Sequence, residues 1–274
     1  MSRQYLVNVH IPKCGGTTFL EVLQRNFGNR YDCSYGHIWR EFYTAEQIQK
    51  FIVSDLRFEA FSSHEISLDL PFNSEIIDLV CTVSLRDPLQ RCVSHYFFER
   101  QRGTTKFKDV LTLSLNGFLE EILNHDDHWL FDYQTKHLVK NTSFKGAADI
   151  IKFAGTARIF PIVLERFSES MVSLEQRLPH WFSDCSFTPT NQSKHTEHAD
   201  AELTAEFCKR SSQDAKLLEW ANGTLDEFVT QDPDAHQLLV ARFNKRCRKL
   251  ARRNAIFDKL RGFARWNRNL MLNR

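Results

Sequence analysis

The chain has 274 residues, 42% of them hydrophobic, with 23 phenylalanines and a formal net charge of +2, so it carries enough apolar side chains for a folded core. No apolar run is long enough to span a membrane and no leader-like segment precedes the first expected strand, which argues against a membrane protein and favours a cytoplasmic one. The seven cysteines are odd in number and include no C-x-x-C pair, which argues against a metal site and against a fully paired disulfide framework.

The first expected elements are a β-strand at residues 5–9, the loop H-I-P-K-C-G-G-T-T at residues 10–18, and a helix that runs to Phe27. Paired glycines let backbone N–H groups approach a bound group, and a helix N-terminus adds unpaired donors and a positive dipole end. We therefore expect the loop to bind phosphate. The residues expected to contribute are Lys13, Cys14, Gly15, Gly16, Thr17 and Thr18.

Two features of this loop leave alternatives open. Its lysine precedes the glycines, whereas the usual nucleoside triphosphate loop places lysine after the last glycine. If this motif is considered alone, a glycine turn beside a solvated lysine would also explain the pattern. The position of Cys14 near the helix N-terminus would lower the pKa of an exposed thiol, and a buried, inert thiol is the alternative.

The next segments lead to a candidate base. Residues 29–43 are aromatic and polar, include His37, and are expected to form a loop beside the substrate. A helix capped at Thr44 follows, and residues 58–64 are then expected to form a short strand that ends in His64. A histidine that titrates near neutral pH at a strand end is suited to accept a proton, although it is also consistent with a structural histidine.

A second motif follows a buried strand. The apolar run at residues 79–85 is typical of a strand in a parallel sheet, and it is followed by R-D-P-L-Q-R-C-V-S-H-Y at residues 86–96. Asp87 and Pro88 predict a helix start, which places Arg86 at the carboxyl end of a strand, where parallel sheets bind ligands. Ser94 lies on the following helix.

The rest of the chain supports a single α/β domain over residues 1–241, with a central parallel sheet flanked by helices. Residues 115–123 and 168–178 have helical spacing, and residues 157–167 are expected to form a further strand. The element Y-Q-T-K-H-L at residues 133–138 and the polar loop at residues 189–196 lack a clear core pattern. In that loop, Lys194 and Thr196 are candidate phosphate ligands, and a solvated loop is the alternative.

Together the two motifs resemble the cofactor signature of sulfotransferases that use 3′-phosphoadenosine 5′-phosphosulfate (PAPS), most closely the Golgi carbohydrate branch typified by heparan sulfate 2-O-sulfotransferase. The resemblance implies a P-loop-like sulfotransferase fold in which Lys13 and residues 14–18 hold the 5′-phosphosulfate while Arg86 and Ser94 hold the 3′-phosphate. It places a comparable polar loop with Lys194 and Thr196 over the cofactor phosphates.

The resemblance also implies a catalytic base, and its position matches His64, with His37 and Glu65 as alternatives. The acceptor would be a hydroxyl, and by resemblance a carbohydrate. No metal is expected. Two residue patterns extend the likeness. Q-T-K-x-L at residues 134–138 would lie on the acceptor side, and a helix with solvated polar residues is the alternative. V-L-E-R-F-S-E-S-M at residues 163–171 resembles the family's V-x-x-E-x-F-x-E-S-[ML] strand and helix. Golgi members begin with a membrane anchor, so a Golgi location would require that an anchor had been removed.

The expected C-terminal tail, residues 242–274, is basic and contains twelve Lys or Arg with one acidic residue, Asp258, whereas the remainder carries 24 basic and 33 acidic residues. Such a tail suits an anionic membrane surface, or a helix packed on the domain, and we expect no nucleic acid partner. Two other functions stay open: a nucleotide-dependent kinase of similar topology, and a non-catalytic protein that captures glycan or lipid through the tail.

Overall fold

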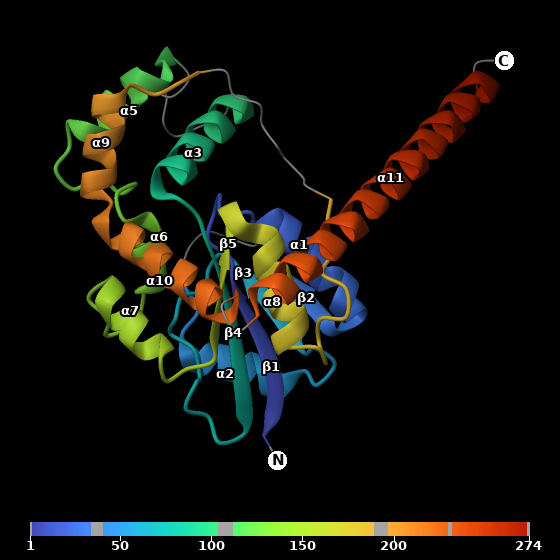
Figure 1. The fold of residues 1–274 in the computed structure, drawn as a ribbon, viewed down its shortest axis with the longest axis horizontal. Helices are drawn as coiled ribbons and strands as arrows, with labels where there is room; N and C mark the ends of the chain where they lie inside the picture. The colour runs from blue at the N-terminus through green and yellow to red at the C-terminus, as the bar shows by residue number, and fades with distance from the viewer. Residues whose placement is uncertain (1, 34–40, 104–111, 189–196, 230–231, 273–274) are drawn as a thin grey trace.

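The computed structural model describes residues 2–33, 41–103, 112–188, 197–229 and 232–272, with side chains to residue 256. Within these ranges the strands form one five-stranded sheet in the order β2-β3-β1-β4-β5, and every neighbouring pair is parallel. Figure 1 shows helices on both faces of this sheet. The predicted fold class is therefore confirmed. The strands are β1 (Arg3–Val9), β2 (Tyr31–Cys33), β3 (Ala60–Ser63), β4 (Ile77–Leu85) and β5 (Ile159–Val163).

The strands β1 and β4 each begin two residues earlier than expected, and the other three strands differ from the prediction in extent or existence. The edge strand β2 lies in the segment that we expected to be a loop, and it pairs with β3 from Tyr31 to Cys33. The strand β5 ends at Val163, because the chain turns into a 3-10 helix, Leu164–Arg166, instead of extending to residue 167. The strand β3 stops at Ser63, so His64 is the first residue beyond it.

The helices connect the strands or form an additional layer. Figure 1 shows α3, α5 and α9 grouped at one end of the molecule, and their apolar side chains form a cluster of their own around Tyr96, Phe118 and Phe207. The helices are α1 (Gly16–Phe27), α2 (Ala45–Ser54), α3 (Pro88–Arg102), α5 (Leu115–Leu123), α6 (Tyr133–Leu138), α7 (Ala147–Ala154), α8 (Phe167–Arg177), α9 (Ala201–Arg210), α10 (Ser212–Val229) and α11 (Pro233–Leu272), with a short 3-10 helix at Gly28–Arg30.

Two predicted helix starts have the expected caps. The Thr44 hydroxyl accepts a hydrogen bond from the Gln47 N–H, while the Gln47 side chain accepts one from the Thr44 N–H, which completes a capping box. Asp87 accepts from the Gln90 N–H at 2.8 Å, and Pro88 occupies the first helical position. The second cap fixes the point at which β4 passes into α3.

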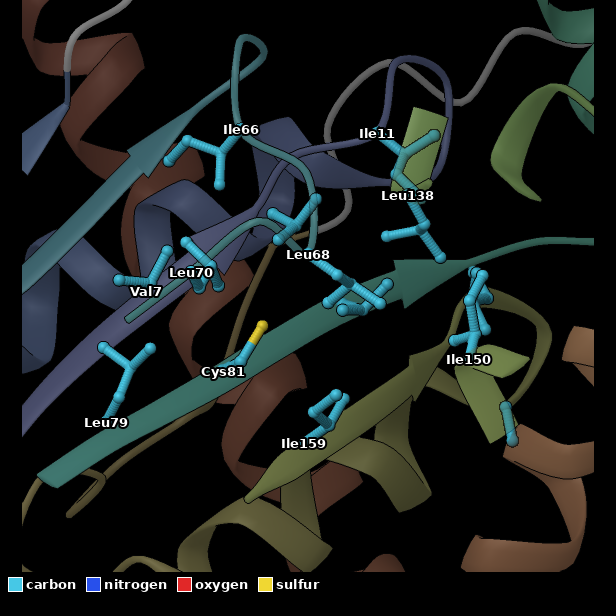
Figure 2. Packing of buried hydrophobic residues seen from close by; sticks show 14 of the residues in the cluster. Val7, Ile11, Ile66, Leu68, Leu70, Leu79, Cys81, Leu138, Ile150 and Ile159 are labelled. Carbon is cyan, nitrogen blue, oxygen red and sulfur yellow. The ribbon is translucent and has the colours of Figure 1, made fainter. Parts of the chain in front are cut away.

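The alternation of side chains along β1 explains why both faces of the sheet are buried. Tyr5, Val7 and Val9 join one cluster, with side chains of α2, α7 and α10, whereas Leu6 joins the opposite cluster, with side chains of α1, α8 and α11. Figure 2 shows the first cluster, in which Val7, Leu79, Cys81 and Ile159 come from neighbouring strands.

The long helix α11 packs on the domain with its first half and extends beyond it. Phe243 is fully buried, and Arg246 forms ion pairs with Glu175 and Asp184. Figure 1 shows the C-terminal part of α11 projecting away from the body of the molecule. No helix within the described residues is long and apolar enough to cross a membrane.

Candidate active site

The candidate site lies at the carboxyl ends of the parallel strands, where α/β sheets bind ligands. The segment after β1 contains Lys13, and His64 follows β3 directly. Arg86 follows β4 directly, and the 3-10 helix that contains Glu165 follows β5. Segments far apart in the sequence are thus brought to one edge of the sheet.

The loop after β1 has an unusual backbone. Lys13 has a φ of 71° and Gly15 a φ of 78°, and both values lie in the left-handed region. This region suits glycine, but it costs a residue with a Cβ on the order of 1–3 kcal/mol. Gly15 is also the N-cap of α1, and its lack of a side chain leaves the first amides of that helix without a side-chain cap. The loop therefore presents uncapped donors at a helix N-terminus.

The packing of His10 against the loop explains why the second glycine, Gly16, is required. A Cβ atom on Gly16 would lie 1.7 Å from Nε2 of His10, so the His10 imidazole occupies the space that any other residue would need. His10 is only 3% exposed. Burial, together with the neighbouring imidazoles of His64 and His137, lowers its pKa from 6.5 to about 2, so the ring supporting the loop is neutral.

A direct hydrogen bond joins the two sequence motifs. Nη1 of Arg86 donates to the Lys13 carbonyl oxygen at 3.1 Å. Glu165 holds the second motif from the other side, because its Oε1 accepts from the Asp87 N–H at 3.0 Å and lies 4.0 Å from Nε of Arg86. Burial lowers the pKa of Arg86, and carboxylates such as Glu165 oppose that shift.

The Lys13 ammonium lies over an aromatic ring. Nζ is 3.9 Å from the centre of the Phe98 ring on α3, a cation–π geometry. Burial, and next the positive charge of Arg86, lower the pKa of Lys13. Phe98 is 39% exposed, so the ammonium lies beside an accessible apolar surface.

A third cation, to which the sequence reasoning gave no role in the site, interacts with both of these through its charge. Arg91 on α3 is 1% exposed, and its guanidinium stacks over the Tyr133 ring at 4.0 Å. Its Nη2 has no hydrogen-bond partner within the described part of the chain. Its charge helps to lower the pKa of Lys13 and of His95. The site therefore concentrates positive charge, which favours a bound anion.

The candidate base His64 is half-buried, and its ring lies against that of His10, with 4.0 Å between ring centres and a tilt of 34° between the ring planes. Its Nδ1 lies 2.7 Å from the His10 carbonyl oxygen. A carbonyl oxygen can only accept, so Nδ1 carries the proton in the neutral ring, and Nε2 is the nitrogen with acceptor character. Burial lowers the pKa of His64 from 6.5. Next to it, the Glu65 carboxylate accepts a hydrogen bond from the Ser63 hydroxyl.

The remaining predicted site residues are placed as follows. The Cys14 thiol is fully buried and directed at Gln134, and burial raises its pKa to about 12, so it is the inert thiol of the two alternatives. Thr17 is exposed and Thr18 is buried in the first turn of α1, and Ser94 is half-buried on α3. His37, Lys194 and Thr196 lie outside the described residues.

The element at residues 133–138 faces inward. Gln134 and Thr135 are buried and hydrogen-bond to Asp214, whereas Lys136 pairs with Asp127 at the surface. Sequence reasoning missed the first two as site residues, and only the Q-T pattern pointed to them. Among the described residues, no three His, Cys, Asp or Glu side chains gather in a metal-binding arrangement.

The sheet, the helix start without a side-chain cap and the clustered cations define an α/β protein with a positively charged candidate site at the carboxyl edge of its sheet. The model of the sulfotransferase family matches residues 2–158, more than half of the chain and a range that includes both motifs. The chain belongs to the sulfotransferase family.

Two individual proteins are similar to it. An uncharacterised protein of Archaeoglobus fulgidus is 27% identical over 202 residues, which cover 67% of this chain and 77% of that protein. The crystal structure of a sulfotransferase from Alicyclobacillus acidocaldarius matches with a TM-score of 0.44 and 14% identity, over 81% of this chain and 97% of that one.

Proposed function

We propose that the protein transfers a sulfuryl group from PAPS to a hydroxyl group of a carbohydrate acceptor. The observation that carries this proposal is the hydrogen bond of 3.1 Å between Arg86 and the Lys13 carbonyl, because it unites the two expected anion-binding motifs in one site. A nucleotide with a charged group at each end fits two such motifs.

The residues present fit the donor in charge and in hydrogen-bonding capacity. Lys13 and the N–H groups of residues 15–18 would hold the 5′ end, while Arg86 and Ser94 would hold the 3′-phosphate. The donor supplies the activated sulfuryl group. Lys13 and the uncapped amides would stabilise the negative charge that grows on the departing oxygen, an effect that is larger in the transition state than in the ground state.

His64 is the proposed base, because an acceptor hydroxyl attacks well only if its proton can leave. The contact between Nδ1 and the His10 carbonyl holds the tautomer in which Nε2 can take that proton. The lowered pKa keeps the ring neutral, and thus competent, at neutral pH. Positioned proton transfer of this kind contributes about 100- to 10,000-fold.

Exposed aromatic rings next to the site support a sugar acceptor. Phe98 is 39% exposed and lies against the Lys13 ammonium, and Trp129 is 37% exposed with its ring 5.2 Å from that of His95. Flat apolar faces beside polar groups suit the C–H face of a sugar ring.

Calorimetry with adenosine 3′,5′-bisphosphate tests the donor site. We expect the wild type to bind it without magnesium, and Arg86→Ala to weaken that binding at least tenfold. Lys13→Ala should reduce sulfuryl transfer from radiolabelled PAPS by orders of magnitude, and His64→Ala should lose most turnover while still binding the bisphosphate. Magnesium-dependent binding of ATP in preference to the bisphosphate would instead support a kinase, and glycan binding without turnover would support a non-catalytic protein.

We also propose that α11 attaches the protein to an anionic membrane surface. Arg248, Lys249, Arg252 and Arg253 are all exposed, and they follow the fully buried Phe243 along α11. Each cation near an anionic surface contributes about 1 kcal/mol.

Sedimentation with phosphatidylserine vesicles tests this attachment. Changing these four residues to Gln should abolish binding, whereas changing four exposed lysines elsewhere should not; suitable controls are Lys50, Lys140, Lys209 and Lys216. Equal sedimentation of both variants would refute the membrane proposal. Retention on heparin without vesicle binding would assign the basic surface to a glycan.

A further inference from the structure

The side-chain amide of Gln134 forms hydrogen bonds with the backbone of Arg86 through both its oxygen and its nitrogen. Its Oε1 accepts from the Arg86 N–H at 2.9 Å, and its Nε2 donates to the Arg86 carbonyl oxygen at 2.8 Å. The same Oε1 lies 3.4 Å from Sγ of Cys14 in the loop after β1. Gln134 is fully buried, with no exposed surface. One amide therefore touches both motifs of the proposed donor site.

The orientation of this amide is forced by a buried carboxylate. Oδ2 of Asp214 accepts from Nε2 of Gln134 at 3.3 Å and from its backbone N–H at 3.0 Å. A flipped amide would direct its oxygen at this carboxylate and its NH₂ group at the Arg86 N–H. The flip would therefore lose every one of these side-chain hydrogen bonds. Asp214 thus fixes which end of Gln134 meets which group of Arg86.

Asp214 caps the start of α6, and Asp132, just before α6, caps the start of α10. Oδ1 of Asp214 accepts from the Thr135 N–H at 2.7 Å and from the Thr135 hydroxyl at 2.8 Å, at the start of α6. In return Asp132, just before α6, accepts from the backbone N–H groups of Gln213 and Asp214 in the first turn of α10. Because each helix start is capped by the other helix, α6 and α10 hold Gln134 in a fixed place.

We propose that Gln134 is a positioning residue that sets the selectivity of the donor site for a nucleotide with a 3′-phosphate. This inference rests on the proposed function, in which Arg86 binds that phosphate. Arg86 lies between β4, which ends at Leu85, and α3, which begins at Pro88. The Gln134 amide forms hydrogen bonds with both the N–H and the carbonyl oxygen of Arg86, and thereby fixes the direction in which the guanidinium leaves the backbone.

The test compares adenosine 3′,5′-bisphosphate with adenosine 5′-monophosphate, which lacks only the 3′-phosphate, by calorimetry on folded protein. We expect the wild type to bind the bisphosphate more tightly, and Gln134→Met, which keeps the length but not the amide, to reduce the ratio of the two affinities at least tenfold. Lys136→Met, a change at a partly exposed position on the same helix, should leave the ratio unchanged. If Gln134→Met does not fold, Gln134→Asn, which withdraws the amide by one methylene, is expected to reduce the ratio likewise.

The ratio separates positioning from general destabilisation. A variant that merely lowers the fraction of binding-competent protein weakens both nucleotides by the same factor, so an unchanged ratio in Gln134→Met overturns the inference. In an Arg86→Met background, Gln134→Met should have no further effect on the ratio, and an undiminished tenfold effect there would also overturn it. A wild type that does not distinguish the two nucleotides would refute the proposed donor site itself.

Discussion

Buried histidines should make the protein acid-sensitive, and His137 allows the contribution of one of them to be isolated. His137 is 6% exposed, with Nε2 3.0 Å from the Ile66 carbonyl oxygen. Burial lowers its pKa from 6.5 to about 3 in the folded protein. Between these values the unfolded chain binds a proton that the folded protein does not, so stability is unaffected above pH 6.5 and falls as the pH decreases below it.

The size of the effect follows from the two pKa values. Between pH 7 and pH 5, one such histidine lowers the free energy of unfolding by about 2 kcal/mol. His10, with its pKa lowered to about 2, adds a similar loss. Together the two remove about 4 kcal/mol, a large part of the 5–15 kcal/mol of a typical domain.

Urea unfolding followed by circular dichroism at pH 7 and pH 5 measures this loss. We expect His137→Gln, which keeps a donor for the Ile66 carbonyl, to lose about 2 kcal/mol less than the wild type over this range, whatever its stability at pH 7. His180→Gln, at an exposed site, is the matched control and should lose as much as the wild type. An equal loss in His137→Gln and wild type would show that His137 does not stay neutral in the fold.

Two further predictions concern the site. Lys13→Gly should be more stable to urea than Lys13→Ala by about 1 kcal/mol, because the φ of 71° suits glycine. Both variants should lose turnover. Equal stability of the two would mean that the loop relaxes out of the left-handed conformation. The pH profile of kcat/KM should rise through a midpoint below 6.5, since burial lowers the pKa of His64, and a midpoint above 6.5 would exclude His64 as the base.

The sequence was sufficient for the elements whose determinants are local. The apolar run before Arg86 predicts a buried parallel strand, and Asp87 with Pro88 predicts the start of α3 as observed. The carboxyl ends of parallel strands meet at one edge, so the two motifs could be expected to come together before any contact was known.

Features that depend on distant contacts were not accessible in this way. The strand β2 has only three residues, and its pairing with β3 rather than its own pattern stabilises it. For the Q-T element, the acceptor side and a helix with solvated polar residues were both open. Gln134 in fact turns inward, because Asp214, eighty positions further along the chain, accepts hydrogen bonds from its side chain and backbone. Nothing near Asp214 in the sequence indicates that role.

The glycines of the first motif show how one pattern can have two physical causes. We expected both to let the backbone approach a ligand, and Gly15, with its left-handed φ and uncapped helix start, is consistent with that reading. Gly16 is required for another reason, since the His10 ring fills the space beside it. A protonated His10 would place a fourth positive charge beneath Lys13, Arg86 and Arg91. The burial that makes the fold acid-sensitive therefore also keeps the support of the loop neutral, so that the charge facing a bound anion comes from the lysine and the two arginines.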